Sequence, residues 1–184
     1  MRMKFRILLA IAAMMWAPAA LALDVGPAVG THIPEFHAQD DQAKPVGLKD
    51  IAGKNGTVLV FFRSAKWCPY CQAQLIDLKK AAAPLEQRGY RLVAISYDDP
   101  EVLATFTKRR DIPYTLLSDK GSVMIDAFKL RDPQYPPGNM AYGVPQPSIF
   151  VISPDGIVRA KLAEEGFKHR PSNEAILAAV DGLK

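Results

Sequence analysis

Two cysteines separated by two residues carry the clearest chemical signal in this sequence. They lie in Cys68-Pro69-Tyr70-Cys71 and are the only cysteines among the 184 residues. An apolar run, residues 57–62, precedes them and a helical pattern follows, so the pair is predicted at the first turn of a helix. The unpaired N–H groups and positive dipole end there favour a thiolate over a thiol. One thiol can resolve a mixed disulfide formed at the other, which is the chemistry of a thiol–disulfide redox centre.

Two other uses of a cysteine pair fit the sequence less well. A zinc site needs four Cys or His ligands, which usually arrive as two close pairs. The histidines are His32, His37 and His169, and none has a partner at such a spacing, so we expect no bound metal. A structural disulfide is the second alternative, but so small a loop removes little entropy from the unfolded chain. Redox chemistry is favoured, and it requires no metal or organic cofactor.

The first 22 residues have the layout of a secretory signal peptide. The basic residues at its start are Arg2, Lys4 and Arg6. An uncharged, mostly apolar run follows to Trp16, and Ala20-Leu21-Ala22 is a small-x-small cleavage pattern. The apolar run is shorter than the ~20 residues that span a bilayer. We therefore expect a signal peptide over residues 1–22 and one domain over residues 23–184, periplasmic or secreted, with no stable membrane insertion after cleavage.

Charge composition gives no reason to invoke a nucleic acid or a membrane surface as a partner. The chain has 23 Lys+Arg against 19 Asp+Glu, and loss of the three basic residues of the signal peptide would leave 20 against 19. The 162 residues that remain are enough for one domain with its own core. In an oxidising compartment the cysteine pair will be oxidised unless a partner reduces it. We therefore expect a separate electron donor or acceptor.

Strand and helix patterns alternate along the domain. Apolar strands are predicted at residues 57–62 and 91–96, with a helical apolar stripe between them that Pro84 should kink or end. A right-handed crossover makes such strands parallel. The other expected elements are edge strands at 34–38 and 44–46, a helical turn at 48–51, a helix capped by Asp99, a strand at 114–117, a helix at 123–128, a proline-rich ordered loop at 131–147, a hairpin of 148–152 with 157–162, and a last helix capped by Ser172 or Asn173. The sequence therefore predicts an α/β fold with a mixed central sheet flanked by helices.

Several blocks of the chain are similar to the thioredoxin superfamily. The first runs from Val58 to Phe62 and on to Trp67-Cys68-Pro69-Tyr70-Cys71 and Gln74-Leu75. Further blocks are residues 92–96, 116–119 and 150–156, and the likeness covers nearly all of residues 34–183. More narrowly, the blocks resemble the peroxiredoxin-like branch related to alkyl hydroperoxide reductase and thiol-specific antioxidant proteins. That resemblance implies a thioredoxin-like fold and either disulfide reductase or peroxidase activity.

The resemblance also implies roles for individual residues. Cys68 would be the exposed attacking thiol and Cys71 the more buried resolving thiol, with Trp67 as the aromatic residue flanking the site. Pro147 would be the cis-proline, after Gln146, that faces the cysteines and offers backbone hydrogen bonds to a bound peptide. The alternatives for these two residues are simple packing for Trp67 and an ordinary trans proline at position 147.

The sequence departs from the family pattern in ways that bear on mechanism. Thioredoxins commonly carry a buried acid six residues before the first cysteine, where this chain has Phe62, so another group or water must accept the proton. Typical peroxiredoxins place Thr or Ser three residues, and Pro seven residues, before the peroxidatic cysteine; before Cys68 these positions hold Ala65 and Phe61. Before Cys71 they hold Cys68 and Ser64, and no matching arginine is evident near Pro147. Lys66 could lower the thiol pKa of Cys68, or could be a solvated surface lysine.

We therefore expect an exported thiol–disulfide oxidoreductase, acting on a disulfide-containing protein or a small thiol or hydroperoxide. A thiol peroxidase, in which Cys68 becomes a sulfenic acid, is the alternative enzyme. A binding module with a passive disulfide is the non-enzymatic alternative, and its working surface would be the loop at 131–147 with Tyr135 and Tyr142.

Overall fold

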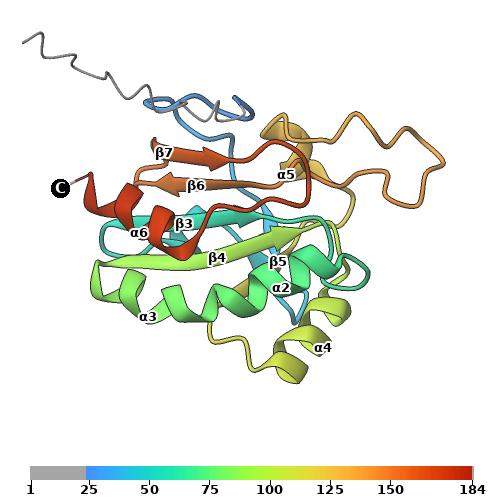
Figure 1. Cartoon of the computed structure of the whole chain (residues 1–184), viewed down its shortest axis with the longest axis horizontal. Coiled ribbons are helices and arrows are strands. Elements are labelled where there is room, and N and C mark those ends of the chain that lie inside the picture. Colours follow the sequence, from blue (N-terminus) through green and yellow to red (C-terminus); the bar gives the residue numbers. More distant parts are fainter. Residues whose placement is uncertain (1–23, 184) are drawn as a thin grey trace, which may run out of the picture.

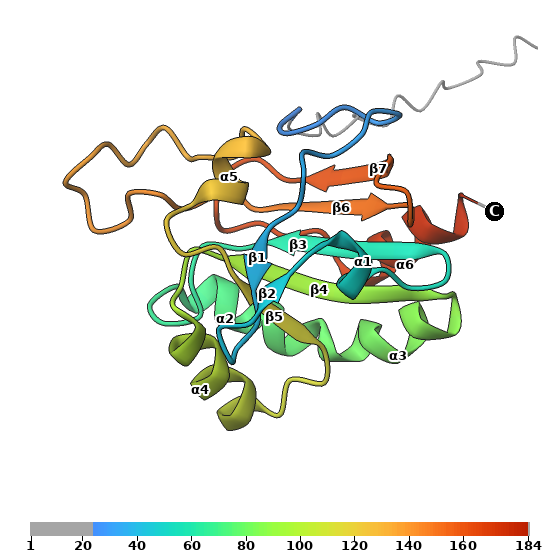
Figure 2. The same cartoon turned by 180° about the vertical axis from the view of Figure 1, so that it is seen from behind.

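The computed structural model describes residues 24–183, in which seven strands form a single mixed sheet in the order β2-β1-β5-β4-β3-β6-β7 (Figures 1 and 2). The strands are β1 (Ala38–Gln39), β2 (Pro45–Val46), β3 (Gly56–Phe61), β4 (Tyr90–Ser96), β5 (Thr115–Ser118), β6 (Ser148–Ile152) and β7 (Val158–Ala163). The helices are α1 (Leu48–Ile51), α2 (Pro69–Asp77), α3 (Lys79–Gln87), α4 (Pro100–Arg110), α5 (Val123–Ala127) and α6 (Asn173–Asp181). The expected α/β class and nearly all expected elements are confirmed.

Strand directions follow the predicted crossovers. β3, β4 and β5 are mutually parallel, because a helical segment returns the chain between each pair. β6 is antiparallel to β3 and β7 is antiparallel to β6, as the hairpin signature at residues 154–156 predicts. In this register Phe61 pairs with both Ile95 and Ser148, so the end of β3 lies between the end of β4 and the start of β6.

The sheet separates two apolar cores, and β3 contributes to both by alternation. Val58 and Val60 belong to the core beneath α2, α3, α4 and α6, whereas Leu59 and Phe61 belong to the opposite core beneath α1 and α5. Figure 1 shows the first set of helices, and Figure 2, from behind, shows α1 with the short strands β1 and β2. A strand buried on both faces reads as a continuous apolar run, which is why β3 was recognisable.

Three local expectations are corrected. The helical segment after the cysteines breaks at Leu78, between α2 and α3, whereas Pro84 lies inside α3, which continues to Gln87. Asp99 occupies the N-cap position of α4, but its side chain makes no cap hydrogen bond and pairs with Lys120 at 2.6 Å. The first edge strand is shorter than expected, with pairing that begins only at Ala38.

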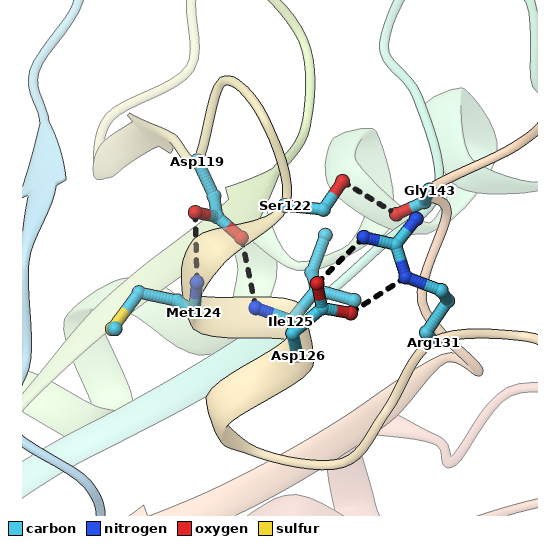
Figure 3. Close-up of polar contacts among 7 residues, drawn as sticks. All are labelled: Asp119, Ser122, Met124, Ile125, Asp126, Arg131 and Gly143. Carbon is cyan, nitrogen blue, oxygen red and sulfur yellow. Dashed lines mark hydrogen bonds and ion pairs between the residues drawn. The ribbon is translucent and has the colours of Figure 1, made fainter.

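Residues 131–147 form a loop whose base is firmly tied, as Figure 3 shows. The guanidinium of Arg131 donates to both carboxylate oxygens of Asp126, each at 2.6 Å, and the hydroxyl of Ser122 donates to the carbonyl of Gly143 at 2.9 Å. The Asp119 carboxylate accepts from the backbone N–H groups of Met124 and Ile125 and so caps α5. The expected ordered loop is confirmed at its base.

The signal-peptide prediction falls on residues outside the described part of the chain. Within residues 24–183, no helix combines the length and the apolar character needed to cross a membrane.

Candidate active site

The loop from β3 to α2 delivers both cysteines. Cys68 is the N-cap of α2, in extended conformation, with Pro69 at the first helical position and Cys71 within the first turn. The two form a disulfide with a Cα–Cα distance of 5.2 Å. The backbone N–H of Cys71 donates to Sγ of Cys68 at 3.3 Å. A helix N-terminal donor thus points at Cys68, an arrangement that stabilises negative charge on its sulfur.

Both cysteines are buried in this oxidised state. Cys68 is 1% exposed and Cys71 is 0% exposed, so the expected exposure of Cys68 is wrong for the disulfide form. Both residues belong to the apolar core beneath α2, which also contains Phe62, and Trp67 packs against that core. Phe62 therefore occupies the acid position of the thioredoxins with a ring that extends the apolar surroundings of the disulfide.

A buried carboxylate holds the loop that carries Cys68. Asp98 follows β4, and its two oxygens accept from the hydroxyl of Ser64 at 2.8 Å and the backbone N–H of Ala65 at 2.6 Å. The hydroxyl of Ser96 adds a third donor at 3.0 Å. Burial raises the pKa of Asp98 above its ordinary value of 3.8, and these hydrogen bonds oppose that rise. Parallel β3 and β4 end at the same sheet edge, so the position of Asp98 was the available sequence signal for this contact.

Replacing Asp98 by alanine should lower the free energy of unfolding by about 2–3 kcal/mol, because the substitution leaves buried donors unsatisfied. Urea unfolding of the two proteins measures the difference. Asp99→Ala is the matched control, because it removes a neighbouring carboxylate that lies in an exposed ion pair, and it should change stability far less. Equal effects of the two substitutions would contradict the assignment.

The same pair of proteins should differ in pH dependence. The folded state retains the Asp98 proton at pH values where the unfolded chain has lost it, because burial raises the pKa of Asp98. The contribution of this group to the free energy of unfolding therefore falls as pH rises above 3.8. Asp98→Ala should lack that fall, so the stability gap between the two proteins should be larger at pH 4 than at pH 7. A stability difference between the two proteins that grows as pH rises would contradict a raised pKa of Asp98.

Lys66 and Trp67 are adjacent residues of the turn before Cys68, but their side chains have different surroundings. The indole N–H of Trp67 donates to the Tyr97 hydroxyl at 3.0 Å, and its half-buried ring packs against the core that contains both cysteines. The side chain of Lys66 is exposed and makes no hydrogen bond or ion pair with another described residue. The substrate-binding role of Trp67 and the pKa-tuning role of Lys66 stay predictions.

Pro147 lies at the same end of the strands as the cysteine loop, because it immediately precedes β6, whose first residue Ser148 pairs with Phe61 at the end of β3. The Gln146–Pro147 peptide bond is trans, as are all peptide bonds of the part that the structure describes, so the expected cis-proline is corrected. The backbone N–H of Gln146 donates to the carbonyl of Leu130 at 2.7 Å. That bond ties this side of the site to the base of the 131–147 loop.

Two arginines near the cysteines were not predicted from the sequence, in which no matching arginine is evident near Pro147. The guanidinium of Arg63 lies over three aromatic rings, with its carbon 4.4 Å from the centroid of Phe167, 4.8 Å from that of Tyr135 and 5.1 Å from that of Trp67. Arg63 is five residues before Cys68, a signal that was available. Tyr135 thus brings the 131–147 loop to the site, as a lip beside Trp67.

The second arginine, Arg170, touches the disulfide itself. Its Nη2 is 3.7 Å from Sγ of Cys71, and its Nε donates to Oε1 of Gln74 at 2.9 Å. Burial, and secondarily the charge of Arg63, lowers the pKa of Arg170 to about 10. Arg170 is 99 residues from Cys71, and only the packing of the segment between β7 and α6 brings it there. The charged group beside Cys71 is therefore a cation, whereas thioredoxins commonly have a buried acid near their cysteines.

Comparison with known proteins decides the family. The model of the AhpC/TSA family matches residues 29–161, which include the whole sheet except the last two residues of β7. The chain belongs to the AhpC/TSA family. The peroxiredoxin-like resemblance of the sequence blocks is thereby confirmed.

AhpC/TSA relatives carry both kinds of name that the resemblance implies. The chloroplastic peroxiredoxin Q of Gentiana triflora is 30% identical over 130 residues, which are 71% of this chain and 56% of that protein. The thiol-disulfide oxidoreductase ResA of Bacillus cereus is 26% identical over 143 residues, which are 77% of this chain and 73% of that protein. The chain spans between 55% and 66% of the length of four chloroplastic peroxiredoxin Q relatives.

A solved structure supports the fold. Peroxidoxin BcpB of Mycobacterium tuberculosis superposes with a TM-score of 0.71 at 23% identity, covering 85% of this chain and 97% of that one. This likeness confirms the thioredoxin-like fold expected of an AhpC/TSA protein.

Within the AhpC/TSA frame, the peroxide-activating positions before Cys68 hold no hydroxyl. Ala65 is buried and gives its N–H to Asp98, and Phe61 is a buried residue of β3. The nearest hydroxyl in the loop, on Ser64, already donates to Asp98 and accepts from the backbone N–H of Lys66 at 2.9 Å. The Ser64 hydroxyl therefore uses its hydrogen bonds to hold the loop in place and does not replace the missing hydroxyl of position 65.

Proposed function

We propose that the protein is an exported thiol–disulfide oxidoreductase of the redoxin type. The observation that carries the proposal is the Cys68–Cys71 disulfide at the N-terminus of α2, with the N–H of Cys71 directed at the Cys68 sulfur. The position of the peroxide-activating hydroxyl carries Ala65 and that of the motif's proline carries Phe61, which favours disulfide exchange over peroxide reduction.

The reaction begins with the reduced protein. The Cys68 thiolate attacks one sulfur of a substrate disulfide; the substrate S–S bond breaks and the leaving thiolate takes a proton from water. Cys71, deprotonated, then attacks Sγ of Cys68 and displaces the second substrate thiolate. The protein loses two electrons and closes the Cys68–Cys71 bond, and the substrate gains the same two electrons. A separate dithiol partner restores the pair by the reverse exchange.

Arg170 supports the second step. A cation beside Sγ of Cys71 stabilises its thiolate, so the proton can leave to water without a buried carboxylate to accept it. Arginine stays charged at neutral pH even with its pKa lowered to about 10. Water therefore accepts the proton that Phe62 cannot, and Arg170 stabilises the Cys71 thiolate that is left.

A thiol peroxidase is the second candidate, favoured by the peroxiredoxin names of several relatives and by the two arginines near the cysteines. In that reaction the Cys68 thiolate takes one peroxide oxygen as a sulfenic acid and releases water or an alcohol. Cys71 then condenses with the sulfenic acid, releasing water and forming the same disulfide.

Stopped-flow fluorescence separates the two candidates. The reduced protein should react with a small disulfide faster than with hydrogen peroxide at equal concentration, because its site offers a thiolate but no hydroxyl to polarise the O–O bond. Trp67 is the only tryptophan beyond residue 22, and its contact with the cysteine core makes it a usable reporter. A peroxide rate at least about a hundredfold above the disulfide rate, about 2.7 kcal/mol in barrier, would overturn the proposal.

Export is tested separately. Residues 1–22 predict that the protein recovered from the exported fraction begins at Leu23, which intact-mass spectrometry would detect. Recovery of the full-length chain in the membrane fraction would show a tethered protein.

A further inference from the structure

Arg63 is a buried cation without an acidic partner. It is 4% exposed, its Nε is fully buried, and no oxygen of residues 24–183 accepts a hydrogen bond from its guanidinium. The three rings of Trp67, Tyr135 and Phe167 offset part of its charge through cation–π contacts. Aromatic rings supply no oxygen acceptor, and a buried charge is costly unless it is paired. A bound anion would supply the oxygen acceptors and the negative charge that the guanidinium of Arg63 lacks.

A second unpaired cation lies close by. The charge of Arg63 contributes to lowering the pKa of Arg170, so the two guanidinium groups repel each other. No carboxylate of the described chain forms an ion pair with Arg170, whose N–H groups donate to Gln74 and to the carbonyls of Phe167 and His169. Glu164 and Glu165, on the same segment, are exposed and pair with neither arginine. Neither charge has a carboxylate partner among the described residues, and one of the two contacts the disulfide, so a bound anion would stabilise both.

A cavity of about 360 Å³ lies beside Arg170, which is part of its lining. It lies along α2, and its lining includes Tyr70, from between the two cysteines, together with Gln74, Lys168 and Arg170. The ring of Tyr70 contacts that of Phe167 at 5.9 Å, and Phe167 covers Arg63. The one acid of the lining, Asp77, is engaged by Lys80 at 2.7 Å and Asn173 at 2.9 Å. The part of the cavity nearest the cysteines is therefore cationic.

We propose that Arg63 and Arg170 form an anion subsite that holds a carboxylate of the disulfide substrate while Cys68 attacks its sulfur. The inference rests on the proposed disulfide exchange and adds the substrate class, a disulfide with a carboxylate a few bonds from its sulfur. Arg63 supplies the open hydrogen-bond donors, and Arg170 adds charge. Phe167 belongs to the segment between β7 and α6, outside any helix or strand, and its ring must move aside for the carboxylate to reach Arg63.

Three small disulfides of similar length test the subsite on the reduced full-length mature protein. They are 3,3′-dithiodipropionate, which is anionic, bis(2-hydroxyethyl) disulfide, which is neutral, and cystamine, which is cationic. Each rate is divided by the rate of the same disulfide with dithiothreitol, so that leaving-group chemistry cancels. At constant ionic strength the normalised rate should be at least tenfold higher for the anionic than for the neutral disulfide, and lowest for the cationic one.

Arg63→Gln should reduce the anionic-to-neutral ratio towards one, and Arg63→Lys should retain most of it. Arg159→Gln is the matched control, because it removes an exposed arginine that lines a different cavity, with Lys54 and Arg88. It should keep the wild-type ratio. If Arg63→Gln fails to fold, the order of the normalised rates of the anionic, neutral and cationic disulfides with the wild-type protein still tests the anion subsite.

Equal normalised rates for the three small disulfides, together with equal rates for the peptide pair described next, would overturn the subsite and leave disulfide exchange standing. Failure to react with any of them would overturn both. A pair of peptide disulfides that differ only by Glu or Gln beside the cysteine locates the source of the carboxylate. Selectivity in the peptide pair alone supports an acidic protein segment as substrate, and selectivity in the small series supports a small carboxylated disulfide; its absence from both series counts against the inference.

Discussion

Cys68→Ser should abolish turnover, whereas Cys71→Ser should react once with a disulfide substrate and stop as a mixed disulfide. Cys68 is the N-cap of α2 and its sulfur accepts the N–H of Cys71, so negative charge is stabilised on Cys68. Without Cys71, no second thiol can displace the bound substrate. Non-reducing electrophoresis of the Cys71→Ser protein should therefore show trapped adducts, and the Cys68→Ser protein should show few.

Burial does not decide between the two cysteines, because both are buried in the disulfide form. The helix position alone makes the assignment, and the two serine variants test it directly. Thermal unfolding of each variant beside the reduced wild-type protein controls for folding, since serine in an apolar core leaves a hydroxyl in need of a partner. Trapping by Cys68→Ser in place of Cys71→Ser would show that Cys71 is the nucleophile.

Arg170→Met should slow the resolving step about tenfold at pH 7. A cation this close to a thiol lowers its pKa by about 1–3 units, and the gain in nucleophilicity of the less stabilised thiolate offsets only about half of that loss. The first attack, by Cys68, should change less, because the 3.7 Å contact of Arg170 is with Cys71. Quenched-flow trapping of the mixed disulfide gives the two rates separately.

Arg170→Lys is the informative companion variant. It keeps a positive charge but loses the bond from Nε to Gln74, so it should recover most of the resolving rate if charge is what matters. A pH profile adds a second readout, since the apparent pKa of the resolving step should rise in Arg170→Met and not in Arg170→Lys. Equal slowing of both steps in both variants would indicate a structural role for Arg170.

The fold was predictable because its elements leave strong local patterns. β3 and β4 each contain a continuous apolar run that is buried on both faces, and Pro154-Asp155-Gly156 predicts the hairpin of β6 and β7. The cysteine pair was equally local, since strand, loop and helix start follow one another in sequence. The break at Leu78 was not predicted, because a proline six residues later was the stronger local signal.

The charged surroundings of the cysteines were not predictable in the same way. Asp98 reaches the cysteine loop across the end of the sheet, and Arg170 arrives from a segment that follows β7. Neither contact has a short-range pattern, because both depend on which loops the sheet topology brings to one edge. The burial of Cys68 was missed for a similar reason, since the core that covers it is assembled from distant helices.

The tied base of the 131–147 loop separates the stability of the protein from its choice of substrate. The backbone N–H of Asp132 donates to the carbonyl of Val144 at 2.9 Å, so the ends of the loop are fixed to each other as well as to α5. Residues 136–140 at its tip are exposed, and doubling the length of such a segment costs only about 0.6 kcal/mol in closure entropy. Divergence, or deliberate loop exchange, can therefore rework the surface around Tyr135 while the scaffold and the cysteine pair stay intact. Changes in this loop can therefore alter which substrates bind with little loss in the free energy of unfolding.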